Sequence, residues 1–297
     1  MNQVLNYILS FTSHVQCDST QTSCFCETNL QVESKLYQTI TTLDRFFILS
    51  FIRRSGMCLE STVKVSIQTD TVEIVNPNVL LNLNCDPLAN PLILIPVTII
   101  GIDVNHSAAL LVDNRRRHVE YFDPNGSDYT ERWTEIQETL FENVKTRLPQ
   151  HEIVSLDQFC PNGPQGISGD AFCAAWTLLY LRLRIQFPTL SRVMIVRTLT
   201  HLSKLELKLV ISGFLCYLKL YGSQHQIFLA LNIYETVLDI FERFNESSNV
   251  DVQDQFHAEF IRIVNELQEL INSGRFELVK NVYWKNLNLL NQINLKI

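Results

Sequence analysis

The sequence predicts an α+β fold in which a small mixed or antiparallel sheet packs against a central buried helix. Residues 62–75 and Pro91–Ile102 are rich in β-branched and apolar residues, which is typical of strands. Ala171–Phe187 presents apolar side chains in nearly every direction, as a helix surrounded by protein does. We expect a core at 61–190, flanked by a helical N-terminal segment at 1–60 and a helical C-terminal extension at 191–297.

The sequence predicts further helices and strands along the chain. Lys35–Ile52 has the apolar rhythm of a helix, and His106–Asp113 and Arg116–Asp123 form two strands around a turn at Asn114-Arg115. Residues 128–148 form a helix that begins with a capping box of Asp128 and Glu131. Its buried stripe comprises Trp133, Ile136, Leu140, Val144 and Leu148. A further strand covers His151–Gln158, and a glycine-containing loop covers Cys160–Asp170.

Composition narrows the class of protein. Of the 297 residues 46% are hydrophobic and 19% charged, which is typical of a globular chain. The net charge of -7 argues against a nucleic-acid partner, and the basic cluster Arg115-Arg116-Arg117 is assigned to the hairpin turn. Neither an apolar run of 18 residues nor a basic n-region is present, so we expect no membrane partner and an intracellular location.

The eight cysteines lack the spacing of a metal site. There is no CxxC pair, and Cys24-Phe25-Cys26 is too closely spaced for a zinc knuckle. We therefore expect no metal and no cofactor. In a reducing compartment, most of these residues are expected to be small buried thiols.

Cys173 differs from the other cysteines in its sequence context. Gly169-Asp170 is a good helix start with Asp170 as the N-cap, which places Cys173 in the first helical turn. Unpaired backbone N–H groups and the helix dipole there favour a thiolate. The alternative is that Cys173 is simply a packed thiol.

A base and its orienting group can be identified from the predicted hairpin. In a symmetric hairpin about Asn114-Arg115, His106 and Asp123 lie directly opposite each other. A carboxylate in that position fixes the imidazole tautomer and stabilises the imidazolium. A surface His–Asp pair at a strand end is the alternative. Gln165, in the glycine-containing loop, could donate to an oxyanion together with the Cys173 N–H.

The order His106, Asp123, Gln165, Cys173 resembles that of the Ulp-type SUMO proteases and adenovirus-protease-like peptidases. This superfamily has a papain-like fold with a permuted chain. The matching segments lie within residues 95–190: NHSAALLVD, VEYFDPNG and FCPNGPQGISGDAFCAAWTLLYLRLRIQFP. The last two are especially similar to versions found in large DNA viruses. Two positions depart from the pattern, because Ser107 stands where SUMO proteases carry Trp and Ala174 where many cellular members carry Gly.

The resemblance implies a thiol-dependent cysteine peptidase that cuts peptide or isopeptide bonds in a protein substrate. It implies Cys173 as nucleophile, His106 as general base, Asp123 as its orienting group and Gln165 as oxyanion donor. The substrate would be a viral precursor or a ubiquitin-like conjugate, met in the host cytoplasm or in a virion. Two alternatives stay open: a YopJ-type acyltransferase, and a catalytically inactive interaction module with the same fold. The oligomeric state is not predicted.

Overall fold

The structure is a computed structural model, and it describes residues 2–17, 24–26, 37–38, 40–41, 43–53, 55–68, 71–81, 83–101, 105–127, 132–155, 162–247 and 250–296. The strands are β1 Val15–Cys17, β2 Cys24–Cys26, β3 Cys58–Leu59, β4 Val63–Ile67, β5 Val72–Ile74, β6 Leu92–Ile100, β7 Asn105–Asp113, β8 His118–Phe122 and β9 Glu152–Ser155. The helices before the glycine-containing loop are α1 Asn2–Ser10, the 3-10 helix η1 Phe11–His14, α3 Asp44–Ile52, α4 Asn78–Leu81 and α5 Trp133–Arg147. Those from that loop onward are α6 Pro164–Ser168, α7 Cys173–Gln186, α8 Arg192–Thr200, α9 Lys204–Gln224, α10 Ile227–Glu246, α11 Val250–Asn272 and α12 Phe276–Lys296.

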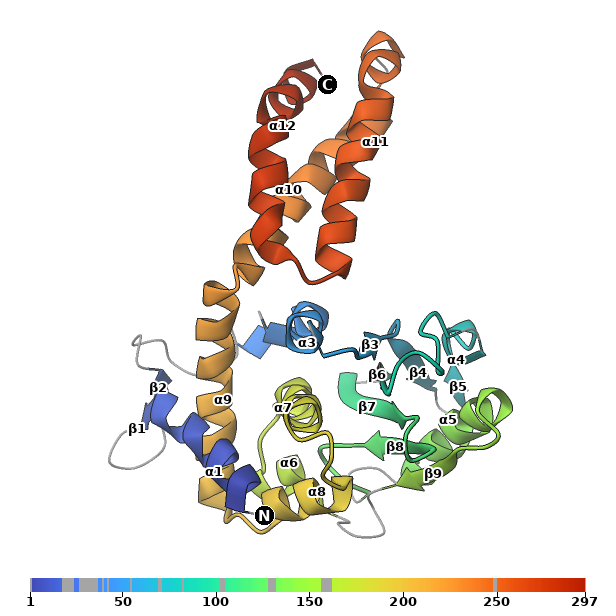
Figure 1. The fold of residues 1–297 in the computed structure, drawn as a ribbon, viewed down its shortest axis with the longest axis vertical. Helices are drawn as coiled ribbons and strands as arrows, with labels where there is room; N and C mark the ends of the chain where they lie inside the picture. Colours follow the sequence, from blue (N-terminus) through green and yellow to red (C-terminus); the bar gives the residue numbers. More distant parts are fainter. Residues whose placement is uncertain are drawn as a thin grey trace. The chain divides into compact units, whose positions relative to one another are not determined.

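The molecule is an α+β protein built around a mixed sheet, as the sequence predicts (Figure 1). The sheet order over the described strands is β5-β4-β6-β7-β8-β9, and β3 also pairs with β6. β6, β7 and β8 are antiparallel, whereas β4 and β9 run parallel to their neighbours β6 and β8. The predicted strands at 62–75 and Pro91–Ile102 correspond to β4, β5 and β6.

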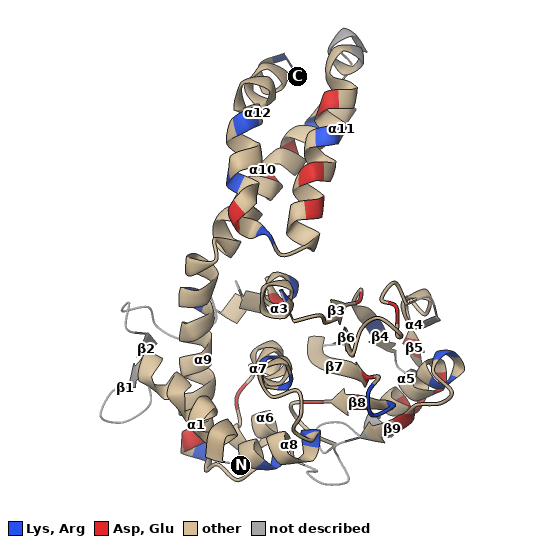
Figure 2. Ribbon diagram, in the orientation of Figure 1, with Lys and Arg blue, Asp and Glu red and all other residues tan. Residues whose placement is uncertain are grey.

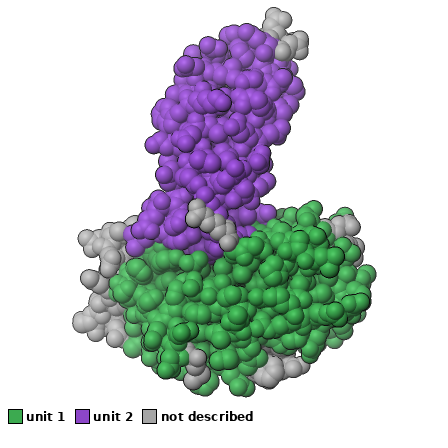
Figure 3. Space-filling view, viewed as in Figure 1, with its two compact units in different colours: residues 1–44, 54–217 green, residues 45–53, 218–297 purple. Residues whose placement is uncertain are grey.

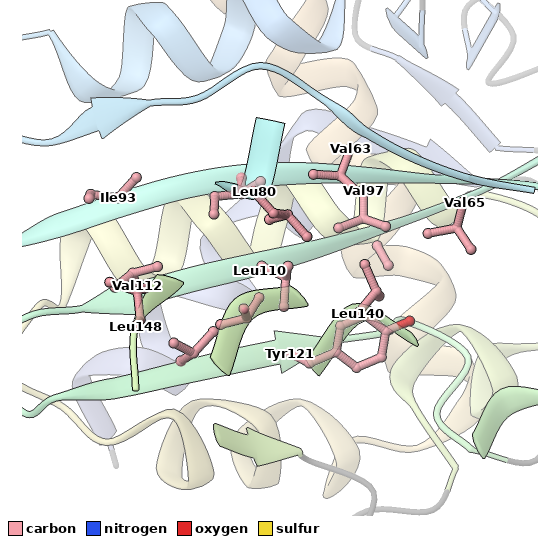
Figure 4. Packing of buried hydrophobic residues seen from close by; sticks show 14 of the residues in the cluster. Val63, Val65, Leu80, Ile93, Val97, Leu110, Val112, Tyr121, Leu140 and Leu148 are labelled. Carbon is pink, nitrogen blue, oxygen red and sulfur yellow. The ribbon is translucent and has the colours of Figure 1, made fainter. Parts of the chain in front are cut away.

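Two helices cover opposite faces of the sheet. On one face, apolar side chains of β4, β6, β7 and β8 meet Leu140 and Leu148, which come from α5 and its C-terminal end (Figure 4). The predicted stripe of α5 is confirmed at Ile136, Leu140, Val144 and Leu148, which are all buried. The Trp133 side chain and the predicted capping box lie outside the described residues. The other face carries α7, where the Tyr180 ring stacks on Phe122 at 4.0 Å.

α7 is joined to the sheet by buried charges as well as by apolar contacts. The Arg184 guanidinium donates to both carboxylate oxygens of Glu120 on β8, each at 3.1 Å, and the Tyr180 hydroxyl donates to Glu120 at 2.8 Å. Arg184 and Glu120 are almost completely buried. Because each group is paired, the α7 axis is fixed against the strands by hydrogen bonds that water does not weaken.

The chain divides into two compact units, coloured separately in Figure 3. Unit 1 comprises residues 1–44 and 54–217 and contains the sheet with α5 and α7. Unit 2 comprises residues 45–53 and 218–297, so that most of α3 belongs to the same unit as α10, α11 and α12. Inside unit 2, Arg53 forms a bidentate ion pair with Glu277 at 2.6 and 2.8 Å.

The N-terminal segment is less helical than expected. β1 and β2 form a two-stranded antiparallel sheet in which Gln16 lies opposite Phe25. The helix predicted over Lys35–Ile52 is interrupted at Leu43, and α3 begins at Asp44. Apolar periodicity alone does not reveal such a break. Leu43 is buried in the interrupted helix, and an unbroken helix would be expected to bury it as well.

The expectation that the thiols are mostly free is wrong for at least three cysteines. Cys58 and Cys85 form a disulfide, with their Cα atoms 5.9 Å apart, and Cys216 is also disulfide-bonded. The physical reason is topological: β3 pairs with β6, and Cys85 lies in the loop that leads back to β6. Cys173 is a free thiol.

Charged groups are spread over both units, with Arg115, Arg116 and Arg117 gathered at the turn between β7 and β8 (Figure 2). This confirms the hairpin assignment of the basic cluster. Among the described residues, no helix has both the length and the apolar character that crossing a membrane requires. The residues that the structure describes also contain no cluster of three or more His, Cys, Asp or Glu side chains suited to a metal ion.

Candidate active site

His106 and Asp123 form a buried pair at one end of the sheet. His106 Nε2 lies 2.8 Å from Asp123 Oδ1, and the two side chains are 11% and 2% exposed. His106 is the second residue of β7, and Asp123 follows the last residue of β8. The imidazole is therefore held at a strand end, where one ring nitrogen faces the carboxylate, and the ring also forms a hydrogen bond with Cys173.

The register that brings them together differs from the predicted one. Asp113 pairs with His118 and Ala109 with Phe122, so the same register continued would put Asn125 opposite His106, and Asp123 lies two residues before that position. The cause is a turn of four residues, 114–117, in place of the expected two, with Arg117 at a φ of 52°. A shift of two residues keeps every side chain on its face, so the pair still meets across the diagonal.

Asp123 is itself held in place by neighbouring donors. Its Oδ2 accepts the Tyr121 hydroxyl at 3.1 Å, and its Oδ1 accepts the Asn125 backbone N–H at 2.9 Å. With His106 added, three donors surround the carboxylate. The orientation of the carboxylate, and with it that of the imidazole, is fixed before any substrate arrives.

The close approach of two loops fixes the backbone around Asp123. The Gly163 N–H donates to Asn125 O at 3.0 Å, and the Gln165 N–H donates to Pro124 O at 2.9 Å. A Cβ at Gly163 would lie 2.2 Å from Pro124 O, so the position requires glycine for space. The loop of Asp123 is thus joined to α6, a short helix within the predicted glycine-containing loop, which carries Gln165.

Cys173 is the first residue of α7, as the sequence predicts for a thiol in a first helical turn. Asp170 is not the N-cap, because that position is taken by Phe172. Asp170 instead accepts the Phe172 N–H at 2.9 Å and the Trp176 indole N–H at 3.1 Å, which closes the turn before the helix. Trp176 is fully buried and packs in the core.

The pKa values describe an ion pair between Cys173 and His106. Burial alone would lower the pKa of His106, but Asp123 and the hydrogen bond to Cys173 outweigh it and raise that pKa to about 10. Burial likewise opposes ionisation of Cys173, yet hydrogen bonds from His106, Tyr37 and the Ser107 backbone bring its pKa below the ordinary value. Since Nε2 faces Asp123, the Nδ1 side of the ring is the side available to the sulfur.

Gln165 lies on α6 and lines the same cleft as the cysteine and histidine. Its Nε2 donates to the Asp170 carbonyl at 3.1 Å, and its Oε1 is buried without a hydrogen-bond partner among the described residues. The structure therefore brings Gln165 to the site. One amide N–H is engaged with the loop, which leaves the second for another acceptor.

Tyr37 is a site residue that the sequence did not reveal. Its hydroxyl lies 3.4 Å from Cys173 Sγ and accepts the Ala174 N–H at 3.2 Å. The residue is 136 positions away from Cys173 and lies in a stretch with ordinary helical periodicity. No spacing rule links it to the other four residues.

These groups surround a cleft of about 640 Å³ in unit 1. Its walls come from the segment before α3, from β4, β6 and β7, and from the two loops described above. The lining residues include His106, Gln165, Cys173, Tyr37, Lys64 and Asp44. The Cys173 thiol thus lies in a cleft whose volume is in the range usual for ligand-binding sites.

Comparisons with known proteins give little further guidance. No protein-family model and no curated protein matches the chain. Among solved structures, the C-terminal Ulp1 protease domain in complex with Smt3, the yeast orthologue of SUMO, is similar at 10% identity. That match covers 75% of this chain and 96% of the other, with a TM-score of 0.36. A TM-score of this size does not support an assignment of function.

Proposed function

We propose that this protein is a cysteine peptidase that hydrolyses peptide or isopeptide bonds, with Cys173 as nucleophile. The observation that carries the proposal is the buried hydrogen-bonded series from Asp123 through His106 to Cys173 at the start of α7. A packed structural thiol needs neither an imidazole nor a carboxylate behind it. In an attacking thiolate site the imidazole lowers the thiol pKa and transfers the proton, and a carboxylate can hold that imidazole in orientation.

The chemistry follows from the positions of the groups. The Cys173 thiolate attacks the carbonyl carbon of the scissile amide, and His106 then gives its proton to the departing amine as the C–N bond breaks. Water attacks the resulting thioester with His106 as base, which releases the carboxylate and restores the thiolate. Asp123 keeps the imidazole oriented through both steps. The second N–H of the Gln165 amide and the Cys173 backbone N–H are the donors for the oxyanion.

The sequence resemblance extends the proposal to the substrate class. We propose a protein substrate, either a viral precursor or a ubiquitin-like conjugate, bound in the cleft beside Cys173. Ser107 stands where SUMO proteases carry Trp, so the part of the cleft over His106 is lined by a small polar side chain. A substrate tail at this point would be less tightly enclosed than under an indole ring.

Acyl-enzyme trapping tests the proposal. The protein is incubated with ubiquitin and SUMO isopeptide conjugates and with a mixed peptide library, quenched in acid and analysed by mass spectrometry. We expect cleavage products together with an acyl adduct at Cys173, and neither in Cys173→Ala. Cleavage that persists in Cys173→Ala would contradict the proposal, as would absence of cleavage and adduct throughout the panel.

His118→Ala provides a matched control for His106→Ala. His118 lies on the neighbouring strand and pairs with Glu152 at 3.3 Å, at a partly exposed position outside the cleft. We expect cleavage to be lost in His106→Ala and retained in His118→Ala. Equal activity of the two variants would contradict the role of His106.

A further inference from the structure

Tyr37 contributes an oxygen to the immediate surroundings of the reactive sulfur. Its hydroxyl bridges Cys173 Sγ and the Ala174 N–H, at 3.4 and 3.2 Å. Its ring packs against Phe172, with ring centroids 5.0 Å apart. The aromatic contact and the N–H bond fix the hydroxyl from two sides, so its position beside the sulfur is a defined one.

The direction of the two hydrogen bonds follows from elementary chemistry. A backbone N–H can only donate, so the Tyr37 oxygen is the acceptor for Ala174. The single phenolic proton is then free to point to the sulfur. Sulfur is a weak acceptor as a thiol and a much stronger one as a thiolate, because hydrogen bonds to charged acceptors are stronger.

We propose that Tyr37 is a further catalytic residue of this site, one that donates a hydrogen bond to the Cys173 thiolate and keeps it ionised before attack. The inference rests on the proposed function and deepens it. With Tyr37, three donors from two separate parts of the chain surround the sulfur: the His106 ring and the Ser107 backbone N–H, both on β7, and the phenol from the segment before α3.

The ionisation behaviour of the cluster agrees with this geometry. Burial and the neighbouring Cys173 charge raise the pKa of Tyr37 far above its ordinary value, so the phenol keeps its proton wherever the thiolate exists. Other titratable or charged groups stand around the sulfur and the cleft. They are His106 on β7, Asp123 after β8, Asp170 before α7, Lys64 on β4 and Asp44 at the start of α3.

The test is the pH dependence of iodoacetamide alkylation at Cys173 in Tyr37→Phe, which removes the hydroxyl and keeps the ring. We expect the rate at about pH 6 to fall roughly ten- to a hundredfold, the effect of losing one hydrogen bond to a charged acceptor. The rate at high pH stays the same or increases, because a less stabilised thiolate is more nucleophilic. A fluorinated tyrosine at the same position, being a stronger donor, should shift the profile in the opposite direction.

Tyr7→Phe is the matched control, because the Tyr7 hydroxyl accepts from Arg182 at 3.1 Å and does not line the cleft. Thermal unfolding of each variant shows whether the fold is retained. An unchanged profile in Tyr37→Phe would overturn the inference while leaving the proposed function intact. Faster alkylation of Tyr37→Phe at every pH would also overturn it, since the hydroxyl would then merely cover the sulfur. A wild-type thiol that reacts like an ordinary one would contradict both proposals.

Discussion

The His106 imidazole experiences two opposing effects, and their balance determines the chemistry of the site. Burial disfavours the imidazolium, whereas Asp123 at 2.8 Å and the adjacent Cys173 favour it. The net effect raises the pKa of His106 to about 10. The ion pair is therefore expected to persist from the lowered pKa of Cys173 up to that of His106, and its two titrations belong to the pair.

Asp123→Asn tests this balance at the level of a single group. The amide retains a hydrogen bond but loses the charge, so burial then dominates and the pKa of His106 falls. NMR titration of the ring should show a midpoint well below that of the wild type. An unchanged midpoint would contradict the assigned role of Asp123.

The same substitution has a consequence for stability. A raised histidine pKa stabilises the fold fully below the ordinary value of 6.5, and this contribution is lost as the pH rises to about 10. The stability difference between wild type and Asp123→Asn should therefore be greatest below the ordinary histidine pKa and diminish toward about pH 10. Chemical denaturation at several pH values measures it, and a difference that grows with pH would contradict the sign of the effect.

At the scale of elements, the site depends on two loops that lie almost in contact. Gly163→Ala inserts a Cβ at 2.2 Å from Pro124 O, so the loops must separate and the Asp123 carboxylate must move. We expect slower alkylation of Cys173 at about pH 6 and a loss of stability of about 1–3 kcal/mol. Gly56→Ala is not a suitable control, because that glycine has a φ of 69°. Gly166→Ala, whose Cβ would lie 3.1 Å from Asn125 O on the same loop, should show a smaller effect of the same kind.

The buried charges beneath α7 give a second prediction at this scale. Glu120→Gln removes the nearer of the two carboxylates that pair with the fully buried Arg184, the other being Asp113 at 3.5 Å, and breaking a buried pair costs about 3–5 kcal/mol. Urea unfolding measures the loss. Glu135→Gln, in an exposed pair with Arg132, should have little effect. Equal stability of the two variants would show that the buried pair does not hold the helix to the sheet.

Much at this scale could be predicted from sequence, and particular residues show why. The alternation along His106–Asp113 and Arg116–Asp123 identifies both strands and puts His106 and Asp123 on one face. It does not determine the length of the turn, because a turn of four residues and a turn of two residues preserve the same alternation of side chains. The placement of Cys173 follows from the glycine-containing loop before it, yet the cap itself depends on the Asp170 side chain, which bonds to Phe172 and Trp176.

At the scale of the whole molecule, contacts between distant segments are what sequence patterns cannot reveal. Tyr37 and Cys173 share no motif, and neither do Cys58 and Cys85. The three-part division at residues 60 and 190 stays a prediction. Two segments far apart in the sequence, residues 45–53 and 218–297, belong to the same compact unit. Changes of composition along the sequence do not reveal that distant segments share a unit.

The disulfide gives a prediction at this scale. Cys58 and Cys85 close a loop with a sequence separation of 27, and a bridge of that span contributes about 3 kcal/mol. Without reductant, iodoacetamide should leave both residues unlabelled while it modifies Cys173. A Cys58→Ser/Cys85→Ser variant should unfold at lower temperature. Complete labelling of both residues in the untreated native protein would contradict the bridge.

The central claim is that Cys173 is an activated nucleophile paired with His106. The most direct measurement is the rate of iodoacetamide alkylation at Cys173 against pH, by mass spectrometry, in the native protein and in His106→Ala. The account predicts rapid reaction well below the ordinary thiol pKa of about 8.5, and loss of that low-pH reaction in His106→Ala. An ordinary titration in the wild type, or an identical profile in the two proteins, would contradict it.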